Sequence, residues 1–65
     1  MITLELNTTD QTGETIAART VEGRCFRSAI NEGLRELARL HREWPQATHS
    51  LKDDEGFTLF TEVAQ

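Results

Sequence analysis

Residues 21–45, VEGRCFRSAINEGLRELARLHREWP, decide the fold of this chain. Their apolar positions follow one another in steps of 4, 3, 4, 3 and 4 residues, at Phe26, Ile30, Gly33, Leu37, Leu40 and Trp44. Such spacing places them on one face of an amphipathic helix. We predict a helix from about Val21 to Glu43, with Thr20 or Ser28 as its N-cap. It ends there because Pro45 disfavours helical geometry in the residue before it.

Two strands are predicted on the N-terminal side of this helix. Residues 1–8, MITLELNT, alternate apolar and polar side chains with the period of a strand that is buried on one face. Turn-forming residues follow at 9–13, where Gly13 is free to adopt positive φ. Residues 14–21, ETIAARTV, then form the second strand of an antiparallel hairpin. Its alternation predicts two faces, with Ile16 and Ala18 inward and Ala17 and Arg19 outward.

A second hairpin is predicted after the helix. Residues 47–52, ATHSLK, and 57–64, FTLFTEVA, flank the turn sequence DDEG at 53–56. Alternation in the last strand predicts Phe57, Leu59, Thr61 and Val63 inward, and Thr58, Phe60 and Glu62 outward. The order β-β-α-β-β indicates an α+β fold, in which one long helix packs on one face of a four-stranded antiparallel sheet. We expect a single domain over residues 1–65, with Gly33 allowing the sheet to approach the helix closely.

The length and composition favour a small binding module. A chain of 65 residues has little room for both a core and an enclosed active-site cleft. Its one cysteine, Cys25, cannot form an internal disulfide, and we expect it to be a small buried residue. The sequence has neither a run of ~20 apolar residues nor an N-terminal secretion signal. These features predict a cytoplasmic protein with no membrane partner.

No pattern of catalytic or metal-ligating residues is visible. Cys25, His41 and His49 do not form the closely spaced pairs that zinc sites use, and we expect His41 at the edge of the helix stripe and His49 exposed on a strand. DDEG is too short for a calcium-binding loop, and the chain lacks a glycine-rich phosphate loop. No serine, threonine or cysteine has a recognisable base partner. We therefore expect no enzyme activity, no cofactor and no metal.

The charges are distributed unevenly along the chain, although the net charge is only −4. Residues 1–18 carry three acids and no base, residues 19–42 carry six arginines and three glutamates, and residues 43–65 carry five acids and one lysine. We expect acidic hairpins and a basic helix. Alternate strand residues stand about 6.6–6.8 Å apart, close to the spacing of phosphates along a nucleic-acid strand. The candidate partner-binding residues are Asp53, Asp54, Glu55, Asp10, Glu14, Glu5, Glu62 and, as an exposed aromatic anchor, Phe60.

In size, acidity and expected architecture the whole chain resembles the small phage-encoded anti-CRISPR proteins that inhibit type I systems. That resemblance implies a non-enzymatic inhibitor in the cytoplasm of a host bacterial cell, which binds the CRISPR surveillance complex (Cascade), a host DNA-binding protein complex. Its acidic residues would stand in for the phosphates of target DNA. The resemblance implies no direct contact with nucleic acid, and we expect a monomer.

Three alternatives remain open. The acidic turns are also what a solubilising surface would contain. The chain is also compatible with a small regulatory protein-binding module, such as a component of a toxin–antitoxin pair. Finally, the arginine-rich helix is a candidate nucleic-acid-binding element. The net charge opposes that last function, as do the expected ion pairs Glu32–Arg35, Glu36–Arg39 and Arg39–Glu43.

Overall fold

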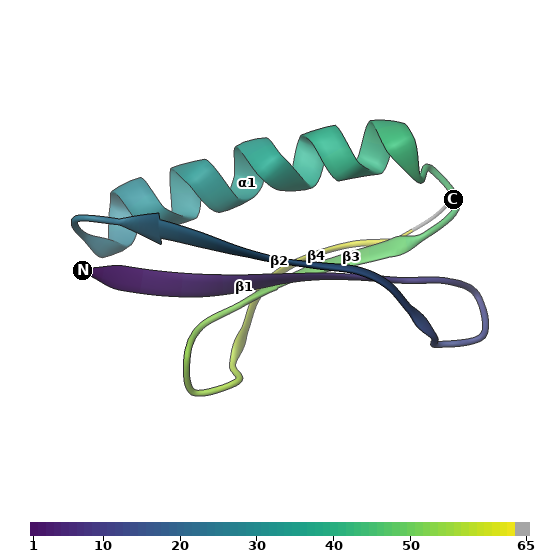
Figure 1. Cartoon of the computed structure of the whole chain (residues 1–65), viewed down its shortest axis with the longest axis horizontal. Helices are drawn as coiled ribbons and strands as arrows, with labels where there is room; N and C mark the ends of the chain where they lie inside the picture. The colour runs from purple at the N-terminus through teal and green to yellow at the C-terminus, as the bar shows by residue number, and fades with distance from the viewer. Residues whose placement is uncertain (64–65) are drawn as a thin grey trace.

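The computed structural model describes residues 1–63, and within them the predicted α+β architecture is confirmed. The elements are β1 (Ile2–Thr9), β2 (Thr15–Gly23), α1 (Phe26–Glu43), β3 (Thr48–Lys52) and β4 (Thr58–Glu62). The strands form a sheet of order β2-β1-β3-β4 in which every neighbouring pair is antiparallel. Figure 1 shows α1 lying along one face of this sheet, while the opposite face carries no helix in the part of the chain described.

The core lies between α1 and the two central strands. Leu4 and Leu6 of β1 and Leu51 of β3 are fully buried against Ala29, Leu37 and Leu40 of the helix. Gly33 faces Leu51 directly: a Cβ atom at Gly33 would lie 2.7 Å from Leu51 Cδ1, which is inside van der Waals contact. The missing side chain therefore permits the close approach of helix and sheet that the sequence predicts.

The helix begins at Phe26 rather than near Val21, because β2 continues to Gly23 and pairs there with Ile2 of β1. Neither Thr20 nor Ser28 is the N-cap. That position is held by Cys25, which is exposed rather than buried as predicted. Ser28 contributes from inside the first turn, where its Oγ accepts a hydrogen bond from the Cys25 backbone N–H at 3.2 Å. The helix ends at Glu43, as Pro45 predicts.

An irregularity in each hairpin changes which side chains face the helix. The register shifts between Thr8 and Thr9 and again between Leu51 and Lys52, so that Ile16 and Leu59 are extra residues in their strands. A bulge of this kind disturbs the strict alternation of a strand. The predicted facing of the residues beyond each bulge is wrong for that reason.

The corrected facing follows from the pairing, because directly opposite residues in an antiparallel pair lie on the same face. In β2, Ala17 and Arg19 pair with Thr8 and Leu6 and face the helix, whereas Ala18 pairs with Asn7 on the open face. In β4 two residues predicted on the open face lie on the helix side: Phe60 opposite Leu51 and Glu62 opposite His49. Phe57 and Val63, which were predicted inward, are 67% and 61% exposed.

Candidate protein-binding surface

Both hairpins turn through the same four-residue geometry, Asp-x-x-Gly. In the first turn Gly13 N–H donates to the Asp10 carbonyl at 3.1 Å, and in the second Gly56 N–H donates to the Asp53 carbonyl at 3.2 Å. The two glycines adopt φ values of 89° and 90°, a left-handed conformation that glycine reaches without steric cost. Asp10 and Asp53 therefore occupy equivalent positions.

The carboxylates of these two aspartates hold the turns together. Asp10 Oδ1 accepts from the N–H of Thr12 at 2.9 Å, the hydroxyl of Thr12 at 2.6 Å and the N–H of Glu14 at 3.0 Å. The Thr12 hydroxyl, followed by the Glu14 N–H, lowers the pKa of Asp10 below its ordinary value of 3.8. Asp53 Oδ1 accepts from the N–H groups of Glu55 and Phe57, both at 2.9 Å.

The two turns lie at opposite ends of the sheet (Figure 1). Thr9, which precedes the first turn, pairs with Thr48 at the start of β3, whereas Lys52 at the end of β3 pairs with Glu5 and leads into the second turn. Five of the predicted partner-binding residues therefore divide into two separate groups: Asp10 and Glu14 at one end, and Asp53, Asp54 and Glu55 at the other.

The remaining predicted residues lie on neither turn. Glu5 is exposed on the open sheet face, directly opposite the positively charged Lys52. Glu62 lies on the helix side, where its Oε1 is 4.0 Å from His41 Nε2. His41 is half-buried at the edge of the helix stripe, as predicted. The eight residues do not form one surface.

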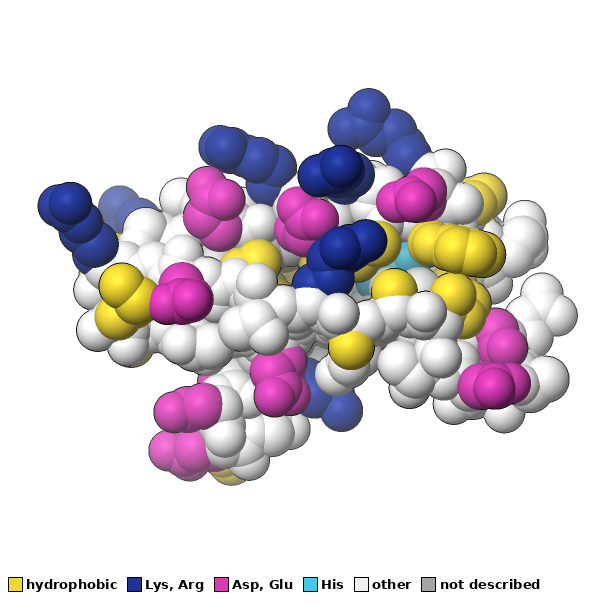
Figure 2. Space-filling model, in the orientation of Figure 1, with side chains coloured by type: hydrophobic (Ala, Val, Ile, Leu, Met, Phe, Trp, Pro, Cys, Tyr) yellow, Lys and Arg dark blue, Asp and Glu magenta, His cyan; other side chains and the backbone are white. Residues whose placement is uncertain are grey.

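The second turn projects from the body of the protein as a small acidic lobe, which we define as Asp53, Asp54, Glu55 and Phe57. Figure 2 shows this lobe below the sheet, with acidic side chains at its tip. Asp54 and Glu55 are exposed, and Phe57 beside them is 67% exposed. The prediction that Phe60 is the aromatic anchor among the carboxylates is wrong, because Phe60 lies on the helix side and is 41% exposed. Phe57 occupies that place instead. The sequence could have indicated this, because Phe57 directly follows the Asp-x-x-Gly turn at residues 53–56.

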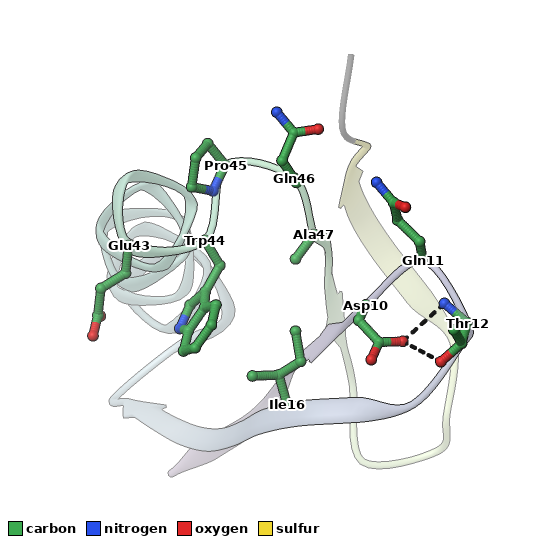
Figure 3. A pocket seen from close by; sticks show the side chains of 9 residues that line it. All are labelled: Asp10, Gln11, Thr12, Ile16, Glu43, Trp44, Pro45, Gln46 and Ala47. Atoms are coloured by element: carbon green, nitrogen blue, oxygen red, sulfur yellow. Dashed lines mark hydrogen bonds between the residues drawn. The ribbon is translucent and has the colours of Figure 1, made fainter.

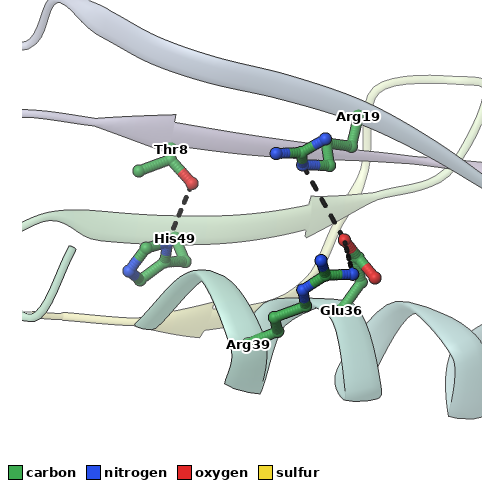
Figure 4. A network of polar contacts seen from close by, with 5 residues as sticks. All are labelled: Thr8, Arg19, Glu36, Arg39 and His49. Carbon is green, nitrogen blue, oxygen red and sulfur yellow. Dashed lines mark hydrogen bonds and ion pairs between the residues drawn. The ribbon is translucent and has the colours of Figure 1, made fainter. Parts of the chain in front are cut away.

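The charges separate only in part. Dark blue side chains gather on the helix side in Figure 2, with acidic side chains between them. Glu36 Oε1 lies 3.8 Å from Arg19 Nε and 3.9 Å from Arg39 (Figure 4), and Glu32 lies 3.5 Å from Arg35. Two predicted helix pairs are confirmed; the third, Arg39–Glu43, does not form within residues 1–63. The arginines are confined to the helix side, but the acids are not confined to the other side.

His49 is fully buried, contrary to the prediction of an exposed strand residue. Its Nδ1 lies 2.8 Å from the Thr8 hydroxyl (Figure 4), and its Nε2 lies 3.2 Å from the carbonyl oxygen of Trp44. A carbonyl can only accept, so Nε2 donates and Nδ1 accepts from Thr8. The ring therefore fastens the residue that follows α1 to the sheet, which is a structural role.

The Cys25 thiol lies apart from the histidines and is exposed. Hydrogen bonding from the N–H of Ser28 lowers the pKa of the exposed Cys25 thiol, but no base or second thiol accompanies it in the described chain. Over residues 1–63, no group of three or more His, Cys, Asp or Glu side chains is arranged to hold a metal ion. The acidic lobe brings three consecutive carboxylates and an exposed phenylalanine together on one turn.

Comparison with known proteins adds no family to this description. No family model, curated protein or solved structure matches the chain. Within residues 1–63, no helix combines the length and the apolar character that are needed to cross a membrane.

Proposed function

We propose that the protein is a non-enzymatic inhibitor that uses its acidic lobe to occupy a cationic groove of a nucleic-acid-binding complex, and so excludes the nucleic acid. The observation that carries the proposal is the lobe itself: three consecutive carboxylates and an exposed phenylalanine on a turn that projects beyond the sheet (Figure 2).

The lobe is built to bind without a large loss of conformational freedom. The Asp53 carboxylate holds the N–H groups of Glu55 and Phe57, so the turn has its shape before a partner arrives. Preorganisation of this kind lowers the entropic cost of association. Asp54 and Glu55 form no ion pair with any residue of 1–63, which leaves their carboxylates available to lysine or arginine of a partner.

Phe57 supplies the apolar part of such a contact. Full burial of a phenylalanine side chain is worth about 1.5–3 kcal/mol. Charge complementarity around it accelerates encounter with a basic surface and disfavours acidic ones. An aromatic anchor with a charged rim is a common arrangement in protein interfaces.

The partner class follows from the charge of the lobe. Grooves that hold nucleic acid are lined with lysine and arginine, which neutralise phosphates. Carboxylates on a projecting turn can engage the same side chains. The resemblance in size and acidity to anti-CRISPR proteins makes the type I surveillance complex the first host complex to test, with the protein acting as a monomer in the bacterial cytoplasm.

A competition experiment tests this function. A labelled target duplex is bound to purified type I surveillance complex, and the protein is added while the anisotropy of the duplex is followed. We expect the duplex to be displaced at saturating protein, and the complex to be retained by immobilised protein in a pull-down. DNA binding that stays unchanged at saturating protein would rule the proposed function out.

The arginines of α1, together with Arg24 just before it, favour a second candidate, direct binding to nucleic acid. Arg24, Arg27 and Arg42 are exposed and form no ion pair in the described structure, so they are free to contact phosphates. Such binding would weaken steeply with salt. Arg27→Glu and Arg42→Glu would each reduce it, and duplex binding that is insensitive to both substitutions would exclude this function.

A further inference from the structure

β4 is an edge strand of the sheet, and α1 leaves its helix side partly open. The sheet order is β2-β1-β3-β4, and α1 packs chiefly against the other three strands. Figure 3, in which α1 is seen nearly end-on, shows the pale yellow β4 on the far side of β3 from the helix. Phe60 of β4 and Leu34 of α1 are for that reason both exposed apolar residues.

The outer edge of β4 offers hydrogen-bonding groups that suit an extended chain. Alternate backbone N–H and C=O groups of an edge strand point away from the sheet. Within residues 1–63, β4 pairs with β3 alone, and no further backbone hydrogen bond reaches residues 58–62. Addition of a strand to such an edge is a recurrent mode of peptide recognition. The edge therefore specifies an extended segment of chain as its ligand.

The other edge strand, β2, is protected. α1 packs over β2, and Arg19 on its helix side lies 3.8 Å from Glu36 of the helix. A covering helix and charged side chains are common ways of protecting a strand edge. In β4 the residue at the middle of the strand is instead the exposed, apolar Phe60.

The larger groove of the molecule, about 630 Å³ between the first turn and the end of α1, gives no such indication of a ligand. Its two acidic residues do not face its interior. Figure 3 shows Asp10 turned toward Thr12 of its own turn and Glu43 directed away from the groove. The edge of β4 is the better candidate for a binding site.

An open groove of about 430 Å³ lies beside this edge, between α1 and β4. Its lining combines apolar residues with polar ones at one end: Leu34, Leu37, Ala38 and Phe60, then His41, Arg42 and Glu62. Alternate side chains of an added strand would point toward the helix side of the sheet. A side chain that points there would enter the groove, and the lining favours an apolar one.

The acidic lobe leads directly into β4 and specifies the charge of the ligand. Asp54 and Glu55 form no ion pair with any residue of 1–63, so a strand laid along β4 would pass close to unpaired carboxylates. Phe57 of the lobe and Phe60 at the groove are three positions apart, or ~10 Å in an extended strand. A lysine or arginine about three positions from an apolar residue would meet both features.

We propose that β4 binds an extended segment of the partner protein by strand addition. The backbone of the segment pairs with the outer edge of β4, one apolar side chain enters the groove between α1 and β4, and a lysine or arginine lies beside the lobe. This contact rests on the function proposed for the lobe and deepens it, because it gives the same partner a second point of attachment.

A designed peptide stands in for the unidentified segment in the test. Acetyl-Lys-Thr-Thr-Val-Thr-Thr-Lys-amide carries a lysine three positions from its valine on either side, so it suits both strand directions. It is titrated into isotope-labelled protein while the backbone amide resonances are followed. We expect saturable shifts along β4 and at Leu34 and Ala38. Replacement of both lysines by glutamine should weaken binding about threefold or more.

Methylation of the peptide backbone distinguishes strand addition from general adhesion. N-methyl groups on alternate residues remove the N–H donors from one edge of the peptide and leave its side chains and charge unchanged. Of the two alternate sets, one faces β4 and its methylation should weaken binding about fivefold or more. The other faces solvent, and its methylation should stay within about twofold of the parent peptide.

Two pairs of variants test the groove and the lobe. Ala38→Gln places a long polar side chain in the groove and should weaken binding about threefold, whereas Asn31→Gln, at an exposed helix position that does not line the groove, should not. Glu55→Gln removes a carboxylate from the lobe and should weaken binding about threefold. Glu14→Gln removes one at the other end of the sheet and should leave binding unchanged.

Three results would overturn the proposal: equal effects of the two methylated sets, no shifts in β4 at millimolar peptide, or a concentration-dependent dimer through β4 that excludes the peptide. The DNA competition experiment reads the lobe function separately. Displacement of DNA without peptide binding at β4 would refute strand addition and leave the lobe function standing. Peptide binding at β4 without displacement would support strand addition and refute the lobe function.

Discussion

Asp10 and Asp53 perform the same task at opposite ends of the sheet. Each accepts hydrogen bonds at Oδ1 from backbone N–H groups two and four residues further along the chain. The turns differ in what they carry: Gln11 and Thr12 in the first, Asp54 and Glu55 in the second. The protein thus contains two turns of one geometry and unequal charge, which allows turn structure and surface charge to be tested separately.

The first prediction concerns the Asp53 side chain. Asp53→Ala removes the acceptor for two backbone N–H groups and should lower the free energy of unfolding by about 1 kcal/mol. Asp54→Ala, at the exposed neighbouring position, should change it by less than about 0.5 kcal/mol. Urea denaturation measures both. Equal effects of the two substitutions would show that the Asp53 hydrogen bonds do not hold the turn.

The Asp10 carboxylate makes stability depend on pH. Its pKa in the folded protein lies below the ordinary value of 3.8, so the unfolded state takes up a proton first as the pH falls. Its contribution is therefore complete above that value and is lost as the pH falls through the folded pKa. The melting temperature of the wild type should exceed that of Asp10→Asn at pH 7, and the gap should narrow as the pH falls from about one unit above 3.8 through the lower pKa of the folded state. A gap that is constant from pH 7 to pH 2 would contradict this.

Gly33 should be intolerant of a methyl group while Leu51 is present. In Gly33→Ala the new Cβ meets Leu51 Cδ1 and Cδ2 inside contact distance, and overpacking costs about 1–3 kcal/mol. The higher helix propensity of alanine returns up to about 1 kcal/mol, so we expect a net loss of about 1 kcal/mol. In a Leu51→Ala background the same change should stabilise instead. A double-mutant cycle by urea denaturation measures this, and an additive cycle would refute the contact.

Replacing His49 alone should destabilise the protein more than replacing Thr8 and His49 together, because the two side chains form a buried hydrogen bond. His49→Leu leaves the Thr8 hydroxyl buried without a partner and should cost about 1–3 kcal/mol. Thr8→Val added to His49→Leu removes that orphaned group and should restore part of the loss. Thermal unfolding of the two single variants and the double variant measures the coupling. Further destabilisation in the double variant would argue against it.

Much of the fold could be predicted because its apolar periods are clear. The steps from Phe26 to Trp44 specify the helix, and Pro45 specifies its end. The start was missed because Val21 fits both a helix stripe and a strand, and only pairing across to β1 decides for the strand. At the start of this helix, pairing between strands decides the structure and local helix propensity does not.

Which side chains face solvent was harder to predict, because strict alternation of apolar and polar residues does not indicate where a β-bulge occurs. Ile16 and Leu59 are inserted residues, and beyond them Arg19 and Phe60 face the helix instead of solvent. The repeated Asp-x-x-Gly pattern was present in the sequence and indicates that the aspartate at its first position holds the turn. Which of the two turns projects as a lobe depends on the length and path of the strands (Figure 1).

The most direct test of the proposed function compares the two turns by charge reversal in the DNA competition experiment. Glu55→Lys, alone or with Asp54→Lys, should weaken displacement of target DNA from the type I surveillance complex by about tenfold, because it places a cation against a cationic groove. Glu14→Lys makes the same change of charge at the other end of the sheet and should stay within about twofold of the wild type. Equal loss from both reversals, or full displacement by the lobe variants, would contradict a role for the lobe in binding.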